Sequence, residues 1–186
     1  HPQSRCRMSA TNTHAQQRAR AIRLLLLDVD GVLSDGSIVY DSEGRELKRF
    51  HIHDGLGIKL LQQHGIQVGI ITGRVSPMVE RRAHELGIKM LVQGREDKAT
   101  AMYEAIQQLS LSVDAVAYMG DDLPDLAAIS QAGLGIAPAN AVTIVRQHAD
   151  LVTAAGGGHG AVREAAEFIL AAQGQLDAIH TRYTQH

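Results

Sequence analysis

Acidic and small polar residues follow three apolar segments of this chain, at points where predicted β-strands end. Because the carboxyl ends of parallel strands meet at one edge of a sheet, we expect these side chains to gather there. A lysine at the start of a predicted helix joins them. The residues are Asp28 and Asp30 after 24–27, Thr72 after 66–71, Asp121 and Asp122 after 115–119, and Lys98 near the start of a helix predicted over 97–109.

The chemistry that suits these residue types is phosphoryl transfer. Converging carboxylates repel one another unless a cation neutralises them, and an all-oxygen ligand set favours Mg²⁺. A Mg²⁺ ion, a lysine and a small hydroxyl group together suit a phosphoryl group. One carboxylate can attack phosphorus to form an aspartyl-phosphate. A second carboxylate, two residues along, can protonate the leaving alkoxide and then activate water.

The apolar pattern predicts the framework that must position these residues. Leu24–Leu27 is a continuous rather than an alternating apolar run, which is typical of a central parallel strand buried on both faces. Apolar strands and helical stretches alternate after it. This pattern favours an α/β fold, a Rossmann-like doubly wound parallel sheet with helices on both faces. Two short apolar runs, 38–40 and 47–50, flank Asp41-Ser42-Glu43-Gly44 and predict a small β-hairpin inserted at about 34–51.

We predict a single domain over residues 21–174, which contains the hairpin insertion. Residues 1–20 are polar and lack hydrophobic periodicity, so we expect a flexible N-terminal tail there. Residues 175–186 are expected to form a C-terminal tail. The length of 186 residues is ordinary for one domain with its own hydrophobic core.

The composition argues against several classes of protein. Lysine and arginine number 18 against 20 aspartate and glutamate residues, and the formal net charge of −2 argues against a nucleic-acid binder. No apolar run approaches the roughly 18 residues of a transmembrane helix, and no secretory signal is visible. The single cysteine, Cys6, cannot form an intramolecular disulfide and fits a reducing compartment. We therefore expect a cytoplasmic protein with no nucleic-acid or membrane partner.

Four short motifs, in order, resemble those of haloacid dehalogenase-type phosphatases. One such motif alone is weak, since an Asp-x-Asp is commonly a turn or a helix cap. Four in order, each at its expected strand end or helix start, are specific. The motifs are Asp28-Val29-Asp30-Gly31-Val32, Thr72, Lys98 and Gly120-Asp121-Asp122-Leu123-Pro124-Asp125. The resemblance implies the haloacid dehalogenase fold.

Little of the chain is available for the cap domain that covers the active site in many members of this superfamily. Only residues 31–71 separate Asp30 from Thr72, and the hairpin and a short helix predicted over 56–64 occupy them. The site should therefore be open within one subunit, so that either the substrate is large or a neighbouring subunit supplies the lid. Packing of the hairpin against other copies would bury its apolar residues, although it could instead fold back on its own core. Those apolar residues are Ile38, Tyr40, Leu47 and Phe50.

Further segments resemble one family in particular, the capless, tetrameric 3-deoxy-D-manno-octulosonate 8-phosphate phosphatases. The segments are Asp35-Gly36 with the hairpin, 50–59, 70–74 and 157–164, and the resemblance covers about residues 22–180. This family removes the 8-phosphate of an eight-carbon sugar acid in lipopolysaccharide biosynthesis and uses Mg²⁺. The resemblance therefore implies a phosphoric monoester hydrolase whose hairpins assemble a homotetramer. It also implies a flexible glycine-rich segment that reaches into a neighbouring active site.

The resemblance also implies a role for each motif residue. Asp28 would be the nucleophile and Asp30 the acid/base, while Thr72, Gly73 and Lys98 would hold the phosphoryl oxygens. The metal ligands would be Asp28, Asp121 and the backbone carbonyl of Asp30. The residues expected to contact the substrate, some of them across subunits, are Asp30, His51, Ile52, His53, Asp54, Gly55, Lys59, Gly73, Arg74, Arg82 and Lys98. Lys59 and His159 stand where arginine is usual in the family.

Two alternatives remain open at this point. A phosphatase of the same fold could act on a nine-carbon sugar-acid phosphate, since it would share all the catalytic residues. The chain could also be a non-enzymatic tetrameric binding module, although a scaffold gives no reason to cluster this much charge. The segment Gly156–Ala161 fits a dinucleotide-binding pattern, but it stands near the end of the chain, so we interpret its glycines as a source of mobility. His51 and His53 lack an evident third ligand for zinc.

Overall fold

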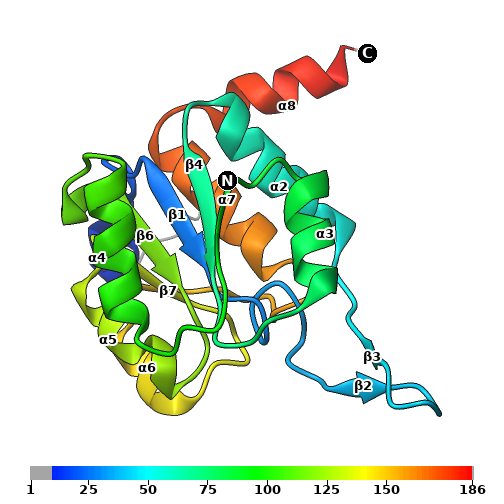
Figure 1. Cartoon of the computed structure of the whole chain (residues 1–186). Coiled ribbons are helices and arrows are strands. Elements are labelled where there is room, and N and C mark those ends of the chain that lie inside the picture. Colours follow the sequence, from blue (N-terminus) through cyan, green and yellow to red (C-terminus); the bar gives the residue numbers. More distant parts are fainter. Residues whose placement is uncertain (1–9, 186) are drawn as a thin grey trace.

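A six-stranded parallel sheet forms the centre of the protein, seen in a computed structural model that describes residues 10–185 (Figure 1). Across the sheet the order is β5 (Met90–Val92), β4 (Gln67–Ile71), β1 (Leu24–Leu27), β6 (Val116–Met119), β7 (Leu134–Ala137) and β8 (Leu151–Val152). The chain builds one side outward from β1 and then returns to build the other. The predicted doubly wound fold is confirmed. Its strand order reverses beside β1, where sheets of this kind bind ligands.

The four leucines of β1 are fully buried on both faces of the sheet. Leu25 and Leu27 belong to one hydrophobic cluster, whereas Leu24 and Leu26 belong to a second cluster on the opposite face. Successive side chains of a strand point to opposite faces, so a central strand between two helical layers needs an uninterrupted apolar run. The run in the sequence therefore predicted this strand correctly.

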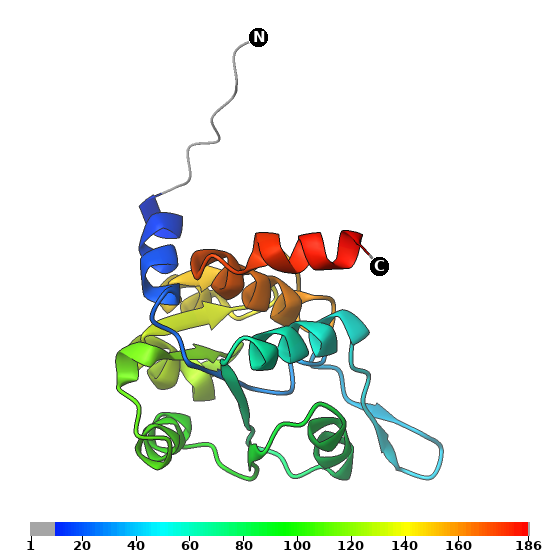
Figure 2. The same ribbon diagram turned by 90° about the horizontal axis from the view of Figure 1, so that it is seen from above.

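Helices cover both faces of the sheet (Figure 1). One layer contains α1 (Ala10–Ala19), α2 (Ile52–Gln63), α3 (Pro77–Glu85) and α7 (Ala161–Ala172), and the other contains α4 (Lys98–Gln108), α5 (Leu126–Gln131) and α6 (Thr143–His148). Short 3₁₀ turns at Val113–Ala115 and Leu123–Asp125 precede β6 and α5. The last helix, α8 (Leu176–Thr184), packs on the outside of α7 (Figure 2). Among the described helices, none is long and apolar enough to cross a membrane.

The predicted insertion is a two-stranded antiparallel hairpin made of β2 (Val39–Tyr40) and β3 (Glu46–Leu47). It projects from the body of the molecule on the side where β1 ends (Figure 1). Ile38, Val39, Tyr40 and Leu47 are exposed there. Phe50, which follows the hairpin, packs instead against the main core, so this residue is not part of the exposed apolar surface that we expected.

Both segments predicted as tails contain helices. In α1, Ala15 and Ala19 are fully buried, and the side-chain amide of Gln173 donates a hydrogen bond to the Ala19 carbonyl (3.1 Å). In α8, Ile179 is buried. We expected a flexible tail over residues 1–20, but residues 10–19 form a packed helix, because a few small side chains on a polar helix suffice for packing and composition does not reveal them. Residues 1–9 of the predicted N-terminal tail lie outside the described residues.

The helix after the hairpin begins earlier than the sequence indicated. We expected it to start at Leu56, but α2 starts at Ile52, because His51 acts as its N-cap. The ring Nδ1 of His51 accepts a hydrogen bond from the His53 amide N–H (3.0 Å). Histidine is not among the usual N-cap residues, so this helix boundary was hard to predict from residue types alone. The segment 51–55 is therefore the cap and first turn of a helix rather than a loop.

Candidate active site

Three neighbouring strands bring the predicted catalytic residues to one edge of the sheet. Strand β1 pairs in parallel with β4 on one side and with β6 on the other. Asp28 follows β1 directly, Thr72 follows β4 directly, and Asp121 comes two residues after β6. The carboxyl ends of these strands lie side by side, so the three residues meet as the sequence predicted.

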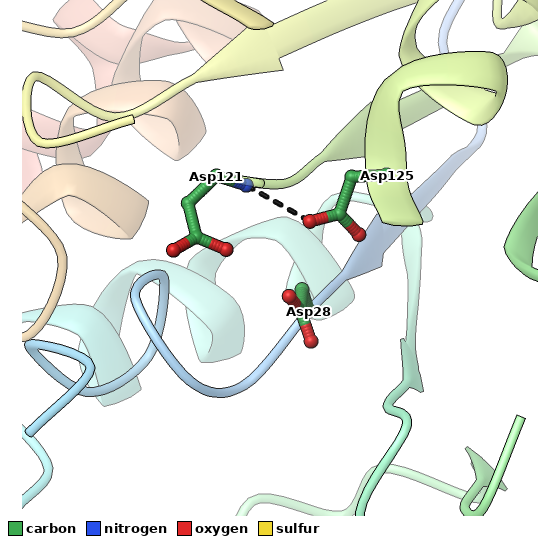
Figure 3. A group of neighbouring side chains, drawn as sticks. All are labelled: Asp28, Asp121 and Asp125. Atoms are coloured by element: carbon green, nitrogen blue, oxygen red, sulfur yellow. Dashed lines mark hydrogen bonds between the residues drawn. The ribbon is translucent and has the colours of Figure 1, made fainter. Parts of the chain in front are cut away.

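Lys98 lies between two buried carboxylates at this edge. Its Nζ is 3.0 Å from Oδ1 of Asp28 and 2.9 Å from Oδ1 of Asp125. Asp121 completes the group: Asp28, Asp121 and Asp125 each present a carboxylate oxygen, and these oxygens lie within 4.8 Å of one another (Figure 3). We refer to Asp28, Lys98, Asp121 and Asp125 as the strand-end cluster.

Asp125 orients the rest of this cluster. Its Oδ1 accepts hydrogen bonds from Lys98 (2.9 Å) and from the hydroxyl group of Tyr118 (2.7 Å). Its Oδ2 accepts hydrogen bonds from the amide N–H groups of Asp121 (3.0 Å, dashed in Figure 3) and Asp122 (3.2 Å). Each oxygen of Asp125 already has two donors. Asp28 and Asp121 are therefore the carboxylates of the cluster that are available to a cation.

The electrostatics of the strand-end cluster are those of a cation site. Burial raises the pKa of both Asp28 and Asp121, and the charge of Asp125 raises each of them further. A divalent cation removes the repulsion between carboxylates that are crowded in this way. The donors are all oxygens, which fits Mg²⁺. Gly31 (φ +86°) lies so close that a Cβ there would overlap the Asp121 carboxylate, so the peptide that joins Asp30 to Gly31 borders the same site.

A second lysine, Lys48 at the base of the hairpin, binds the other aspartate of the first motif. Its Nζ is 2.7 Å from Oδ1 of Asp30 and 3.2 Å from Oε1 of Glu46, and its side chain is only 2 % exposed. The guanidinium group of Arg74 binds both oxygens of Glu46 (2.8 Å each) and lies 4.0 Å from Oδ2 of Asp30. We refer to Asp30, Glu46, Lys48 and Arg74 as the hairpin network.

Comparisons with known proteins agree with this geometry. A family model of haloacid dehalogenase-like hydrolases matches residues 90–164. The 3-deoxy-D-manno-octulosonate 8-phosphate phosphatase KdsC of Salmonella typhi is 46 % identical over 166 residues, which make up 89 % of this chain and 88 % of that protein. The chain belongs to this phosphatase family. The relative of the same name from Haemophilus influenzae is 42 % identical over 89 % of this chain and 92 % of its own length.

Solved structures share the fold over most of the chain. The octulosonate 8-phosphate phosphatase of Moraxella catarrhalis, in complex with a magnesium ion, a phosphate ion and a KDO molecule, has a TM-score of 0.90 and 48 % identity. The match covers 92 % of this chain and 98 % of the chain from Moraxella catarrhalis. A cobalt-bound phosphatase from Haemophilus influenzae has a TM-score of 0.83 and 42 % identity, with coverage of 86 % and 94 %. The family resemblance predicted from the sequence motifs is therefore confirmed.

Thr72 and Gly73 follow the end of β4 in this member of the octulosonate-phosphate phosphatase family. Thr72 is buried, and its Oγ1 accepts a hydrogen bond from the Arg74 amide N–H (3.4 Å). Gly73 is half-buried beside Glu96. The loop that holds the predicted phosphate-binding hydroxyl therefore leads directly into the hairpin network through Arg74.

Several residues expected to contact substrate gather beside the hairpin. Ile52 and Arg82 line a pocket of about 340 Å³ there, and the backbone of Gly55 lies against the Arg82 guanidinium group. The rings of His51 and His53 lie 4.5 Å apart at the start of α2. Within residues 10–185, no hydrogen bond or ion pair joins these five residues to the strand-end cluster. The chain thus brings them together as a separate group.

Asp54 and Lys59, which are also predicted to contact substrate, lie on α2 with different surroundings. Asp54 is buried, and its Oδ1 accepts a hydrogen bond from the Arg163 amide N–H at the start of α7 (3.0 Å). Burial raises the pKa of this carboxyl group, and Oδ2 has no partner among the described residues. The Asp54 side chain therefore links α2 to α7, and its contact with the substrate stays a prediction. Lys59, one turn beyond Gly55 on α2, extends toward Gly87 after the end of α3.

The glycine-rich segment 156–160 packs against the loop that contains the first motif. A Cβ at Gly157 would overlap the carbonyl oxygen of Gly31, so only glycine allows this approach. Asn140 bridges the two segments, since its Oδ1 accepts a hydrogen bond from the Gly157 N–H (2.6 Å) and its Nδ2 donates one to the Gly31 carbonyl (3.0 Å). These glycines permit close packing within the chain, and their mobility stays a prediction.

Sequence reasoning missed Glu46, Lys48, Tyr118 and Asn140, and it quoted Asp125 without giving it a role. The position of Asp125 within the fourth motif was a usable signal. Glu46 and Lys48 stand on a hairpin that was expected to be exposed, where charged residues are ordinary. No local pattern indicates that Lys48 meets a carboxylate 18 residues earlier in the chain.

Proposed function

We propose that this chain hydrolyses 3-deoxy-D-manno-octulosonate 8-phosphate to the free sugar acid and phosphate, as a step of lipopolysaccharide biosynthesis. One observation supports this most directly: Lys98 joins Asp28 to Asp125 at the edge of the sheet, in a chain whose curated relatives bear that activity in their names. These names do not favour a nine-carbon substrate. A complete catalytic set does not favour a non-enzymatic binding module.

Asp28 supplies the nucleophile in this mechanism. Its Oδ1 accepts hydrogen bonds from the Val29 amide N–H (2.7 Å) and from the Lys98 ammonium group (3.0 Å), which leaves Oδ2 to attack phosphorus. A bond forms between Oδ2 and phosphorus while the bond between phosphorus and the ester oxygen breaks, giving an aspartyl-phosphate. Thr72, Gly73 and Lys98 stabilise the charge on the phosphoryl oxygens.

Asp30 transfers the proton in both steps. It first protonates the ester oxygen of the sugar as that oxygen leaves. It then accepts a proton from the water that attacks the aspartyl-phosphate, so that phosphate is released and the Asp28 carboxylate is restored. The Asp30 side chain is 27 % exposed, which leaves it accessible to both the sugar and water.

Mg²⁺ fits the oxygen donors beside the nucleophile. Asp28, Asp121 and the backbone carbonyl of Asp30 would hold it, whereas the oxygens of Asp125 are already occupied by hydrogen-bond donors. When bound, the ion offsets the negative charge of the carboxylates and of the phosphoryl group. The magnesium ion in the solved relative from Moraxella catarrhalis supports this assignment.

Basic residues around the edge of the sheet suit a substrate with a carboxylate as well as a phosphate, which together bear about three negative charges near neutral pH. We assign the sugar acid to Arg74, Arg82, Lys59 and the start of α2 at His51–Gly55, with some of these contacts supplied by a neighbouring subunit. Arg74 is held by Glu46 within this chain, so it would exchange this partner for the substrate.

Phosphate release in the presence of Mg²⁺ tests the function. The substrates to compare are 3-deoxy-D-manno-octulosonate 8-phosphate, a nine-carbon sugar-acid phosphate and simple hexose phosphates. We expect a strong preference for the eight-carbon compound. Equal turnover of all of them would retain the phosphatase but remove the substrate assignment, and the absence of any turnover would favour the binding module.

We also assign the exposed hairpin to assembly of a homotetramer. Its apolar side chains Ile38, Val39, Tyr40 and Leu47 are exposed in the single chain, and a two-stranded ribbon is marginally stable alone. Tyr40→Asp should reduce the molar mass of the assembly, the particle size measured by sedimentation equilibrium. Arg45→Ala, at the charged tip of the hairpin, is the matched control and should leave the particle size unchanged. Equal particle sizes for the wild type and for Tyr40→Asp would contradict this assignment.

A cytoplasmic location fits the single cysteine, which is ordinary for a reducing compartment. Fractionation of cells that produce the protein tests this placement. Recovery outside the cytoplasmic fraction would contradict it.

A further inference from the structure

We propose that Lys48 is a positioning residue for Asp30, holding one oxygen of its carboxylate so that the other oxygen is left for proton transfer. This inference rests on the function proposed above, in which Asp30 is the acid/base. Lys48 acts through Asp30 and is not itself assigned a contact with the substrate. The hairpin therefore takes part in the chemistry of its own subunit, in addition to its role in assembly.

The surroundings of Lys48 distinguish it from an ordinary surface lysine. Tyr40 and Leu47 on the same hairpin are 61 % and 53 % exposed, yet the Lys48 side chain is 2 % exposed. Burial of an ammonium group is costly unless carboxylates pair with it. Two carboxylates do so here, from Asp30 (2.7 Å) and Glu46 (3.2 Å). One of these partners is Asp30, so the buried ammonium group directly contacts the residue assigned to proton transfer.

The contact is also selective between the two oxygens of Asp30. Lys48 binds Oδ1. Within residues 10–185, no hydrogen bond reaches Oδ2, and Arg74 lies 4.0 Å from that oxygen. A carboxylate with one oxygen held and the other open presents its proton from a fixed place, which is a requirement of efficient general acid–base catalysis.

The proton balance follows from this geometry. In the first step, the proton passes from Oδ2 of Asp30 to the ester oxygen of the sugar as the bond from that oxygen to phosphorus breaks. In the second step, the attacking water returns a proton to Oδ2. Lys48 keeps its protons throughout. Glu46 holds Lys48 on its other side and at the same time binds Arg74, so one carboxylate links the positioning lysine to a residue assigned to substrate binding.

A comparison of two leaving groups tests the inference. The substrates are the sugar-acid phosphate, whose alkoxide needs a proton to leave, and p-nitrophenyl phosphate, whose phenolate leaves without one. For Lys48→Met, we expect kcat/KM to fall about 100-fold with the sugar phosphate and less than about threefold with the aryl phosphate. Asp30→Asn should show the same selectivity. Adding Lys48→Met to Asp30→Asn should cause no further loss, because the lysine acts only through Asp30.

Each other outcome contradicts a different statement. In one outcome, Lys48→Met lowers kcat/KM equally with both substrates, whereas Asp30→Asn lowers it only with the sugar phosphate. Lys48 would then merely tether the hairpin, and the inference alone would be overturned. Equal loss for Asp30→Asn would overturn the acid/base assignment and the inference together. A wild-type protein that turns over neither substrate would overturn the proposed function itself.

Control variants separate positioning from folding. Lys89→Met removes an exposed lysine outside both groups and should leave both kcat/KM values unchanged. Lys48→Arg retains the charge, so its kcat/KM with the sugar phosphate should be at least about tenfold higher than that of Lys48→Met. Melting curves of each variant show whether it is folded. If Lys48→Met does not fold, Lys48→Gln removes the charge with a polar side chain, and the same comparison of leaving groups decides the matter.

Discussion

Lys98 and Lys48 lie at the edge of the sheet where we propose the active site, each between two carboxylates, and they differ in what holds them. In the strand-end cluster, the side chains of Lys98, Asp28 and Asp125 are all at least nine-tenths buried, and they stand at the ends of core strands and the start of a helix. In the hairpin network, Lys48 is buried, but the carboxylates of Asp30 and Glu46 are 27 % and 19 % exposed.

The difference matches the two kinds of chemistry proposed for this edge. Nucleophilic attack needs Asp28 in one place, and the central strand provides this because its neighbours on both sides are paired to it. Proton transfer needs Asp30 to meet a sugar oxygen and then water, so partial exposure suits it. The hairpin network depends on a two-stranded ribbon that is marginal without further support. Assembly through the hairpin can therefore influence the hairpin network much more than the strand-end cluster.

Replacement of the nucleophile tests the first half of this comparison and has the largest expected effect. Asp28→Asn should lower phosphate release by roughly 10⁴-fold or more, the scale of losing a covalent nucleophile. It should leave the fold and the assembly intact, as measured by circular dichroism and sedimentation. Substantial activity in this variant would remove Asp28 from the nucleophile position.

Replacement of the orienting carboxylate should show how much stability the strand-end cluster contributes. Asp125→Asn leaves the buried Lys98 ammonium group with one carboxylate charge fewer beside it, so we expect a loss of about 3 kcal/mol in the free energy of unfolding, measured by urea titration. Asp122→Asn is the matched control, since Asp122 is exposed and asparagine can cap the same 3₁₀ turn. Equal effects of the two changes would contradict the special place of Asp125.

The way in which thermal stability depends on pH and on Mg²⁺ should show whether the strand-end cluster binds a metal ion. The pKa values of Asp28 and Asp121 are raised above the ordinary carboxyl value of 3.8, so the metal-free folded state retains protons that the unfolded state has lost. Its stability should therefore fall as pH rises above that value. Mg²⁺ binds the ionised carboxylates, so the rise in Tm that it causes should be larger at about pH 8 than at about pH 5.

Thermal melts with and without Mg²⁺ measure this response. Asp121→Asn removes one ligand and should weaken the dependence on both Mg²⁺ and pH. A rise in Tm that is the same at both pH values, or one that Asp121→Asn leaves unchanged, would contradict the cation site.

The tip of the hairpin should contribute least to activity and to thermal stability. Arg45 pairs with Asp41 (2.7 Å) and Glu43 (3.0 Å), but its side chain is 72 % exposed. Surface pairs of this kind contribute little to stability, because water screens them. Arg45→Ala should therefore change neither kcat/KM nor Tm measurably, in contrast to Lys48→Met at the base of the same hairpin. A large loss of activity in Arg45→Ala would show that the tip also acts on a catalytic site.

The agreement between sequence and structure follows the range of the interactions involved. The leucine run of β1 and the motif residues Asp28, Thr72 and Asp121 were predictable, because strand periodicity and strand-end position are local properties. The helix α1 and the early start of α2 were not, since they depend on packing onto α7 and on an unusual histidine cap. The burial of Asp54 was missed for the same reason, because its partner Arg163 is 109 residues away.

By itself, the sequence determined the doubly wound α/β fold, the order of the four motifs and the family to which the chain belongs. These follow from apolar periodicity and from short motifs whose residues are neighbours in the chain. Only the tertiary structure decided which carboxylate receives which lysine. Lys98 meets Asp125 across 27 residues, and Lys48 meets Asp30 across 18. Such pairs form because the fold brings distant side chains together in a buried place, where an unpaired charge would be too costly to keep.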